Sequence, residues 1–387
     1  MSAGLRLGID ASNLRAGGGI THLAEVLRAG DPEAHGFSQV VVWGATATLA
    51  HLEDRTWLVR HCPRLLDRGL IFRTFWQRFR LARAATATNC DVLLIPGGSY
   101  AGAFRPVVTM CRNMLPFDWR ELLRYGFSAA TLQFFLLRWI QSRTFRRADG
   151  VIFLTRFARD RVLKAVGTLV GAAATIPHGA KPSIVEVPRR QVSIDHYSVA
   201  RPFRILYVSS IQFYKHQWHV AEAVAHLRAA GLPVVLDLVG LPYAPALRRL
   251  RAVMSRIDPE GQFIRYHGGV PHAALSAWYA DADVCVFASS CENMPNILLE
   301  GMAAGLPIAC SDRGPMPEVL GDAGVYFDPE QPATIARALR DLITAPELRQ
   351  RLSHRAAERA VKYTWQTCAD ETLSFIKSVT ERGTNDG

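Results

Sequence analysis

The sequence predicts two doubly wound α/β domains in tandem, and three observations support this. The chain has 387 residues, more than one hydrophobic core ordinarily organises, so two domains are expected. Short apolar runs alternate with segments of helical periodicity, which is typical of parallel sheets covered by helices. The alternation breaks once, over residues 182–203, where Pro182, Pro188 and Pro202 interrupt any regular period.

The first half of the chain contains a series of short, strongly apolar segments that predict buried strands. They cover residues 6–10, 40–43, 91–96, 107–109 and 150–154. Three consecutive glycines, Gly17 to Gly19, follow the first of them and precede a helical pattern over residues 20–28. This half is expected to form one Rossmann-like domain, residues 1–183, followed by a linker over residues 184–203.

A second α/β series begins after the linker. Strands are predicted over residues 204–208, 234–240, 263–268, 284–287 and 308–310, and helices over 216–229, 244–257, 273–280, 295–304, 333–362 and 367–381. Residues 204–364 are expected to form the second Rossmann-like domain. A final helix, residues 365–387, is expected to pack back on the first domain.

The positive charge is concentrated in the first half of the chain. The net charge is +11, and between Arg55 and Asp149 sixteen arginines and no lysine stand against five acidic residues, a balance equal to that of the whole chain. Such a region predicts an anionic partner, such as a membrane surface or a phosphate-bearing lipid. Nucleic acid is not expected, because no recognised nucleic-acid-binding motif accompanies the charge.

Two segments of this basic region place aromatic and aliphatic residues at helical spacing. They carry Phe72, Phe75, Trp76 and Phe79, and Leu132, Phe135, Leu136, Trp139 and Ile140. An apolar stripe of this kind ordinarily packs in a core. An aromatic face bordered by arginine also suits a helix at an anionic membrane surface, so peripheral membrane contact is the second interpretation.

Composition restricts the class of protein further. The seven cysteines are scattered and form no Cys-x-x-Cys pair, which favours a reducing cytoplasm over a disulfide framework. No apolar run reaches the roughly 18 residues of a membrane span, and no signal peptide is expected. Motifs of nicotinamide enzymes, P-loop ATPases and serine hydrolases are not found in the sequence. We expect a cytoplasmic protein, located in part on the inner face of the plasma membrane.

The most informative segment spans residues 287–307. It predicts a buried strand followed by a helix, which Pro295 would begin and Gly305 would end. Glu292 precedes this helix in the loop, and Glu300 lies on the helix. Ligands bind at the carboxyl ends of strands in open α/β sheets, and the amides of a helix start favour a phosphate.

This segment resembles the Glu-x7-Glu signature of the family 4 retaining glycosyltransferases, which are group 1 glycosyltransferases. The resemblance extends to residues 313–324, 267–270, 279–283, 207–209 with Lys215, and 176–179. It covers residues 150–370 well and the preceding part loosely. The fold that it implies is GT-B, in which two Rossmann-like doubly wound domains face each other across a cleft.

The resemblance also implies a role for each site residue. Glu292 would contact the hydroxyls of the donor sugar, Glu300 would accept from the ribose hydroxyls, and Lys215 would neutralise the diphosphate as it leaves. Backbone groups would hold the diphosphate at Asn293, Met294, Pro295 and Asn296 and, in the first domain, at Gly18 and Gly19.

Two positions depart from the family pattern. The family has an arginine about six residues before the lysine, where this chain has Ser209; either Lys215 then acts more alone, or Arg265 or Arg313 compensates. Ser209 is still expected at the donor.

The first domain also lacks the histidine that many family members carry in a loop. Arg112 and Asn113 are the nearest polar residues and become the catalytic candidates there. His267, in the segment 267–270 that matches the family, is expected to bind the donor.

The implied activity is that of a hexosyltransferase. It would move a sugar, with mannose as the favoured hypothesis, from a nucleoside-diphosphate sugar to a glycan or lipid-linked acceptor in cell-surface polysaccharide or lipopolysaccharide synthesis. No metal or cofactor is expected, because Lys215 and backbone amides would replace a divalent ion, and Asp281 and Asp283 are interpreted as a cap. The alternative is a non-catalytic regulatory or scaffold protein that binds the nucleotide sugar.

Overall fold

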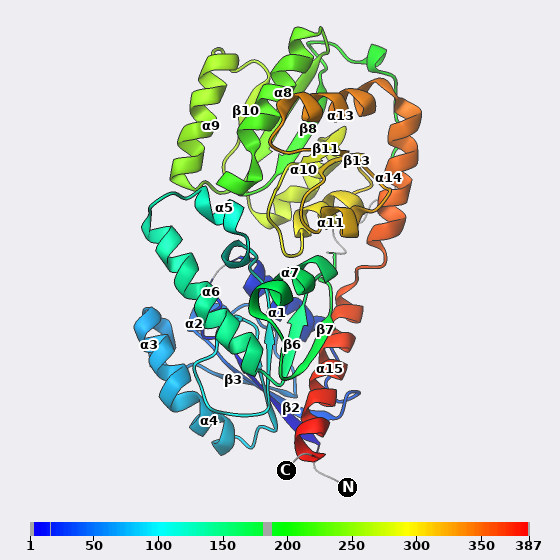
Figure 1. Ribbon diagram of the computed structural model, residues 1–387. Helices are drawn as coiled ribbons and strands as arrows, with labels where there is room; N and C mark the ends of the chain where they lie inside the picture. Colours follow the sequence, from blue (N-terminus) through cyan, green and yellow to red (C-terminus); the bar gives the residue numbers. More distant parts are fainter. Residues whose placement is uncertain (1–3, 16, 181–187, 386–387) are drawn as a thin grey trace. The chain divides into compact units, whose positions relative to one another are not determined.

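The computed structural model describes residues 4–15, 17–180 and 188–385, and residues 184–187 of the predicted linker lie outside this range. The chain divides into two units, shown in Figure 1. The first comprises residues 1–117, 127–179 and 364–387; the second comprises residues 118–126 and 180–363. The first domain was predicted to cover residues 1–183 without interruption, whereas the structure assigns residues 118–126 to the second unit.

The first unit contains a sheet of seven parallel strands in the order β3-β2-β1-β4-β5-β6-β7. The strands are β1 (Leu5–Asp10), β2 (Phe37–Trp43), β3 (Leu58–His61), β4 (Val92–Ile95), β5 (Val107–Met110), β6 (Gly150–Phe153) and β7 (Ala172–Thr175). The central strands are buried along most of their length, as expected for a parallel sheet with helices on both faces. The strand order reverses between β1 and β4, where such sheets form a ligand crevice.

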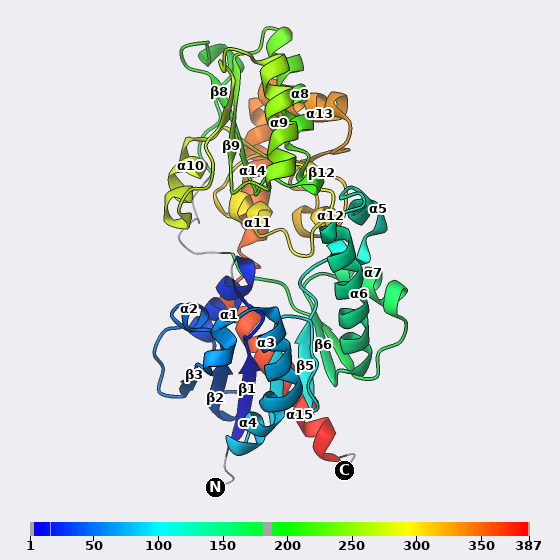
Figure 2. The ribbon, with the colours of Figure 1, turned by 90° about the vertical axis from the view of Figure 1, so that its left-hand side faces the viewer.

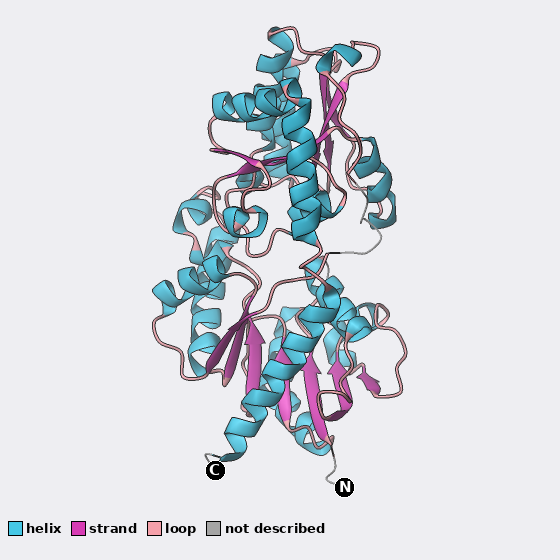
Figure 3. Ribbon diagram, turned by 90° about the vertical axis from the view of Figure 1, so that its right-hand side faces the viewer, coloured by secondary structure: helices cyan, strands magenta, loops and turns pink. Residues whose placement is uncertain are grey.

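Helices of varied length surround this sheet. They are α1 (Gly18–Ala29), α2 (Thr46–Leu49), η1 (Arg64–Asp67), α3 (Leu70–Phe75), the π-helical turn η2 (Trp76–Arg80), α4 (Leu81–Ala87), η3 (Leu115–Phe117), α6 (Ala129–Arg147), α7 (Arg156–Val166) and α15 (Trp365–Asn385). Figure 3 shows α15 crossing the sheet of this unit, and it packs against α1 and β4. The last helix of the chain thus forms part of the core of the first unit.

The second unit repeats the architecture with six parallel strands in the order β10-β9-β8-β11-β12-β13. The strands are β8 (Phe203–Val208), β9 (Val234–Val239), β10 (Ile264–Tyr266), β11 (Val284–Phe287), β12 (Ile308–Ser311) and β13 (Val325–Phe327). The order reverses between β8 and β11, so the loops that follow these two neighbouring strands diverge from a common point.

The helices of the second unit include two that lie side by side, α8 and α9, with α8 against β9 (Figure 2). The helices are α5 (Trp119–Leu123), η5 (Ile194–His196), η6 (Phe213–Lys215), α8 (Gln217–Ala229), α9 (Ala244–Ile257), η7 (His272–Ala274), α10 (Leu275–Asp281), α11 (Asn296–Ala303), α12 (Met316–Leu320), α13 (Pro332–Thr344) and α14 (Pro346–Ala360). Two doubly wound parallel sheets confirm the predicted α/β class. Among the described residues, no helix combines the length and apolar character needed to cross a membrane.

Candidate active site

The loops that follow β8 and β11 bring together two of the predicted site residues. Lys215 ends η6 after β8, and Glu292 lies in the loop after β11. The Lys215 ammonium forms an ion pair with the Glu292 carboxylate. Lys215 is only 7% exposed, and a buried ammonium requires such a partner. The predicted phosphate-binding cation and the predicted sugar-binding carboxylate are therefore direct neighbours.

Aromatic rings surround the Lys215 ammonium. Its Nζ lies 5.1 Å from the ring centroid of Phe287 and 5.3 Å from that of Tyr214, within the range of cation–π attraction. The backbone is held as well, because the Tyr207 hydroxyl donates to the Lys215 carbonyl at 2.7 Å. The position of this cation is thus fixed from several sides.

A pocket of about 300 Å³ lies beside Lys215 at the carboxyl edge of the sheet. Ser209, Gly240, Gly269 and Ile297 are among its lining residues. Gly240 has a φ of 155°, and a Cβ there would lie 2.0 Å from the carbonyl oxygen of Ser209, so only glycine permits this close backbone approach. Ser209, which was predicted at the donor, thus lies in the wall of this pocket, directly against Gly240.

His267, also predicted at the donor, is not among the residues that line this pocket. Its Nε2 lies 2.7 Å from Asp237 Oδ1, and its ring centroid lies 4.4 Å from that of Trp278. The second oxygen of Asp237 accepts from Arg204 at 3.0 Å. The structure therefore gives the His267 imidazole a partner in a buried ion-pair network.

Helix α11 begins one residue later than predicted, at Asn296, because Pro295 has the non-helical ψ of 79°. The Asn296 N–H donates to the carbonyl of Met294 at 3.0 Å, and Pro295 has no N–H. Two of the four predicted positions, Pro295 and Asn296, therefore offer no amide to a diphosphate. Asn293 and Met294 are buried in the same loop.

Glu300 lies inside the unit and not on a solvated helix face. It is 6% exposed, and its Oε2 accepts from the Tyr279 hydroxyl at 3.1 Å. Burial and the Glu300 charge raise the pKa of Tyr279 well above its ordinary value. Close packing follows at the next residue, since a Cβ on Gly301 would lie 3.1 Å from Cys285 Sγ. The two oxygens of an ionised carboxylate can accept from several hydroxyl donors.

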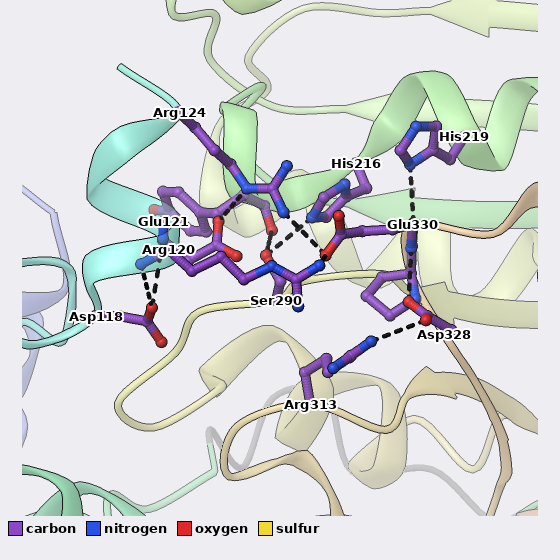
Figure 4. Close-up of polar contacts among 12 residues, drawn as sticks. Asp118, Arg120, Glu121, Arg124, His216, His219, Ser290, Arg313, Asp328 and Glu330 are labelled. Carbon is purple, nitrogen blue, oxygen red and sulfur yellow. Dashed lines mark hydrogen bonds and ion pairs between the residues drawn. The ribbon is translucent and has the colours of Figure 1, made fainter. Parts of the chain in front are cut away.

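Neither arginine proposed to compensate for Ser209 lines the pocket beside Lys215. Arg313 forms an ion pair with Asp328 at 2.8 Å, as Figure 4 shows. Arg265 lines a different pocket, which contains residues from the beginnings of β8 and β9. That end of a parallel sheet is opposite to the carboxyl edge, so compensation by Arg265 was a wrong expectation.

Asp281 and Asp283 have protein partners at the amino edge of the same sheet. Asp283 accepts from the Arg204 N–H at 2.8 Å and from the Tyr197 hydroxyl at 2.7 Å. Asp281 forms an ion pair with Arg204 at 2.9 Å. Both acids lie at the junction between α10 and β11, where the cap was predicted, and both have partners on the protein.

In the first unit, the predicted residues Gly19 and Arg112 lie against each other. A Cβ on Gly19 would lie 2.9 Å from Arg112 Nη1. The Nε and Nη1 atoms of Arg112 are buried and have no hydrogen-bond partner in the described part of the chain. Burial lowers the pKa of Arg112 to about 10. A buried guanidinium without such partners is a group that an anion would stabilise.

Asn113 has a local structural contact. Its Oδ1 accepts from the Leu115 N–H at 3.0 Å at the start of η3, a common turn arrangement for asparagine.

His22 was not predicted from the sequence; it is 3% exposed and its ring packs at a tilt against that of His178, with centroids 4.6 Å apart. Burial, the charge of His178 and that of Arg112 hold the pKa of His22 well below its ordinary value. Its place on α1, three residues after Gly19, was the signal available.

Comparison with known proteins supports the family assignment. Residues 202–345 match the family model described as "Glycosyl transferases group 1". The O-antigen chain mannosyltransferase B of Escherichia coli is 32% identical over 115 residues, which is 30% of this chain and 30% of that protein. The chain therefore matches less than a third of the length of this relative. Over these residues the chain is similar to the group 1 glycosyltransferases.

Solved structures share the complete fold. Sucrose-phosphate synthase from Thermosynechococcus elongatus superposes with a TM-score of 0.71 at 17% identity, covering 99% of this chain and 100% of that chain. HepE of Anabaena, in complex with UDP and glucose, gives a TM-score of 0.68 at 19% identity, covering 96% and 99%. The fold is that of the GT-B glycosyltransferases, as predicted.

The contact between Gly19 and Arg112 predicts energetic coupling. Gly19→Ala should reduce the free energy of unfolding by about 1–2 kcal/mol, because the new methyl group displaces the guanidinium. In an Arg112→Ala background the same change should cost less, because only Leu14 Cδ2, at 3.0 Å, then crowds the methyl group and alanine favours a helix. Chemical denaturation of the four proteins measures this coupling. An equal cost in both backgrounds would contradict it.

Proposed function

We propose that the protein is a retaining hexosyltransferase that takes its sugar from a nucleoside-diphosphate donor. The observation that carries this proposal is the buried Lys215–Glu292 ion pair beside a pocket at the switch point of the second sheet. Glycosyltransferase relatives and neighbours support it, and the neighbour HepE is in complex with UDP. The full activity is a proposal, because the matched relative covers only part of this chain.

The chemistry that the residues can supply is electrostatic. As the bond between the sugar and the diphosphate breaks, negative charge builds on the leaving phosphate. Lys215 would meet this charge with an ammonium that burial and aromatic rings have already positioned, so little reorganisation is required. Glu292, released from part of its ion pair, would accept hydrogen bonds from the sugar, and Glu300 from the ribose. No metal or cofactor is included in this proposal.

Mannose is the sugar we propose, supported by the mannosyltransferase named among the relatives. A glycan or lipid-linked acceptor in cell-surface polysaccharide synthesis, such as that of lipopolysaccharide, is the proposed destination. Gly18, Gly19 and Arg112 in the first unit are proposed to meet the phosphates or the acceptor, and Asn113 to shape that loop. The buried guanidinium of Arg112 supports an anionic group at this site.

Substitution of Lys215 tests the donor site. Lys215→Ala should raise the Kd for a nucleoside diphosphate about 30-fold, equivalent to about 2 kcal/mol for a lost charged hydrogen bond. Glu292→Gln should keep nucleotide affinity within about 3-fold and lower sugar transfer at least about 100-fold. Calorimetric titration with UDP and GDP, and transfer from their sugars, provide the measurements.

Lys362→Ala is the matched control, since Lys362 is exposed in the same unit. Unchanged nucleotide affinity in Lys215→Ala would contradict the donor site. The scaffold alternative predicts a different pattern: donor binding in the wild type, with no transfer to any acceptor extract and no effect of Glu292→Gln on turnover.

We also propose that the first unit contacts an anionic membrane surface, which would suit a lipid-linked acceptor. Most of the predicted apolar stripe is not packed in a core: Phe75 is 45% exposed, Phe79 55%, Leu132 72% and Trp139 64%. Trp76 is the exception and is buried. Large exposed side chains on two neighbouring segments mark an interaction surface.

A basic pocket of about 320 Å³ lies between these two segments. Arg78 of η2 and Arg143 and Arg147 of α6 line it. These three arginines form no ion pair with an acid in the part of the chain that the structure describes. Unpaired guanidinium groups next to exposed aromatic residues fit a surface of anionic phospholipids.

Vesicle co-sedimentation tests this surface. Pelleting with vesicles containing phosphatidylglycerol should exceed that with pure phosphatidylcholine about 5-fold or more and should decrease in high salt, because the attraction is screened. Arg143→Ala/Arg147→Ala should remove most of this difference. Arg337→Ala/Arg340→Ala, on exposed positions of α13, should not. Equal pelleting with both vesicle types would contradict the proposal.

A further inference from the structure

The segment Asp118–Gly126 belongs to the second unit although it precedes the rest of that unit by more than 50 residues. Helix α5 begins after Asp118, whose carboxylate accepts from the N–H groups of Arg120 and Glu121 at 3.1 and 3.3 Å. After the helix, the ring centroid of Tyr125 lies 5.5 Å from that of Phe213. The segment therefore packs on the η6 turn, which ends at Lys215.

Charged side chains of α5 form an alternating network, shown in Figure 4. Glu121 accepts from Arg124 Nε at 2.7 Å. Arg124 and Arg120 both reach Glu330 Oε1, at 2.9 and 2.8 Å. Two carboxylates and two guanidinium groups balance each other, and Glu121 at one end of the network is only 2% exposed.

Glu121 connects this network to both loops of the donor site. Its carboxylate lies within 4.8 Å of a ring nitrogen of His216, and the neighbouring Ser290 hydroxyl favours the charged form of Glu121 and so opposes the rise in its pKa that burial causes. Ser290 lies two residues before Glu292. Ser290 Oγ lies 2.9 Å from His216 Nε2, and the Ser290 N–H donates to the carbonyl of Tyr214 at 2.8 Å. Tyr214 and His216 flank Lys215. Ser290 is thus the junction between the two loops, and Glu121 holds that junction.

The direction of the hydrogen bonds follows from His216. This residue is fully buried, and burial lowers its pKa to about 2, so the imidazole is neutral. Its Nδ1 has no partner among the described residues, which places the single ring proton on Nε2, where it donates to Ser290 Oγ. The Ser290 hydroxyl then donates to the Tyr214 carbonyl at 3.2 Å, and the nearby Glu121 carboxylate favours this orientation of the dipole chain.

We infer that Glu121 is a positioning residue for the donor site: through Ser290 and His216 it holds Lys215 and Glu292 at the separation that the proposed transfer requires. This inference rests on the proposed function. His216 adopts a left-handed backbone with a φ of 51°, which costs a non-glycine residue energy and persists only where surrounding contacts enforce it.

A metal site is the competing interpretation of the same residues. Ligand atoms of Glu121, His216 and Glu330 lie within 4.8 Å of one another. Both carboxylates, however, already accept from guanidinium groups of Arg120 and Arg124. The protein itself therefore supplies two positive charges there, and a divalent cation would have to displace them against repulsion.

Three variants separate positioning from general stability. Glu121→Ala removes the buried carboxylate beside Ser290 and His216 and the partner of Arg124. Glu121→Gln retains a polar group beside Ser290 without the charge. Glu330→Gln weakens the outer ion pairs and leaves Ser290 untouched, so it serves as the matched control.

Glu121→Ala should raise the Kd for UDP or GDP, or lower kcat of transfer, about 10-fold or more while retaining a cooperative unfolding transition. Glu121→Gln should restore most of this loss, and Glu330→Gln should change either value less than about 3-fold. Glu121→Ala/Ser290→Ala should be no worse than the more impaired single variant, since both interrupt one connection. Full activity of Glu121→Ala, or additive losses in the double variant, would overturn the inference.

NMR distinguishes failure of this inference from failure of the proposed function. In the wild type, the ¹⁵N pattern of His216 should show a neutral ring protonated on Nε2 that does not titrate down to about pH 5. Glu121→Ala should shift the backbone amides of Lys215 and Glu292, and Glu330→Gln should leave them in place. Unshifted amides in Glu121→Ala would overturn the positioning role even if no nucleotide sugar proved to be a substrate.

Discussion

The adjacency of β8 and β11 is the constraint on which the proposed donor site depends. Strand order reverses between them, so the two loops that follow leave the sheet in different directions and enclose a space between them. Lys215 enters that space from one loop and Glu292 from the other, and their ion pair joins the two. The pairing of two parallel strands thus determines a contact between side chains 77 residues apart.

Burial makes the Lys215–Glu292 ion pair energetically important. A charge removed from water is expensive unless it is paired, so Lys215 and Glu292 satisfy each other when no donor is bound. A diphosphate offers the ammonium a second anion, and a sugar offers the carboxylate new donors. The same low-dielectric surroundings that make the unpaired charges costly strengthen their interaction with a leaving group. Glu300, buried on α11 beside Tyr279, extends the polar surface of the site along the helix.

Much of the fold was predictable from the sequence, because its central strands are long enough and apolar enough to leave a clear pattern. The strands β3, β7 and β13 were not predicted. They lie at sheet edges, and β7 is a run of alanines and threonine without the large apolar residues that mark a buried strand. Pro346 divides the helix predicted over residues 333–362 into α13 and α14.

Site residues that are close in the sequence could be predicted from it. Site residues that only the fold brings together could not. Glu292 and Glu300 share one segment, whereas the Glu121 carboxylate lies close to the His216 ring from 95 positions earlier in the chain. Nothing in the spacing of Asp118 and Glu121 showed that their helix would join the second unit. Likewise, the pairing of His267 with Asp237 depends on which strands become neighbours.

The most direct test of the account is a crystal structure of the protein with a nucleoside-diphosphate sugar bound. We expect the diphosphate within hydrogen-bonding distance of Lys215 Nζ, the ribose hydroxyls at Glu300 and the sugar at Glu292. A donor bound away from Lys215, with the Lys215–Glu292 ion pair unchanged, would contradict the central claim.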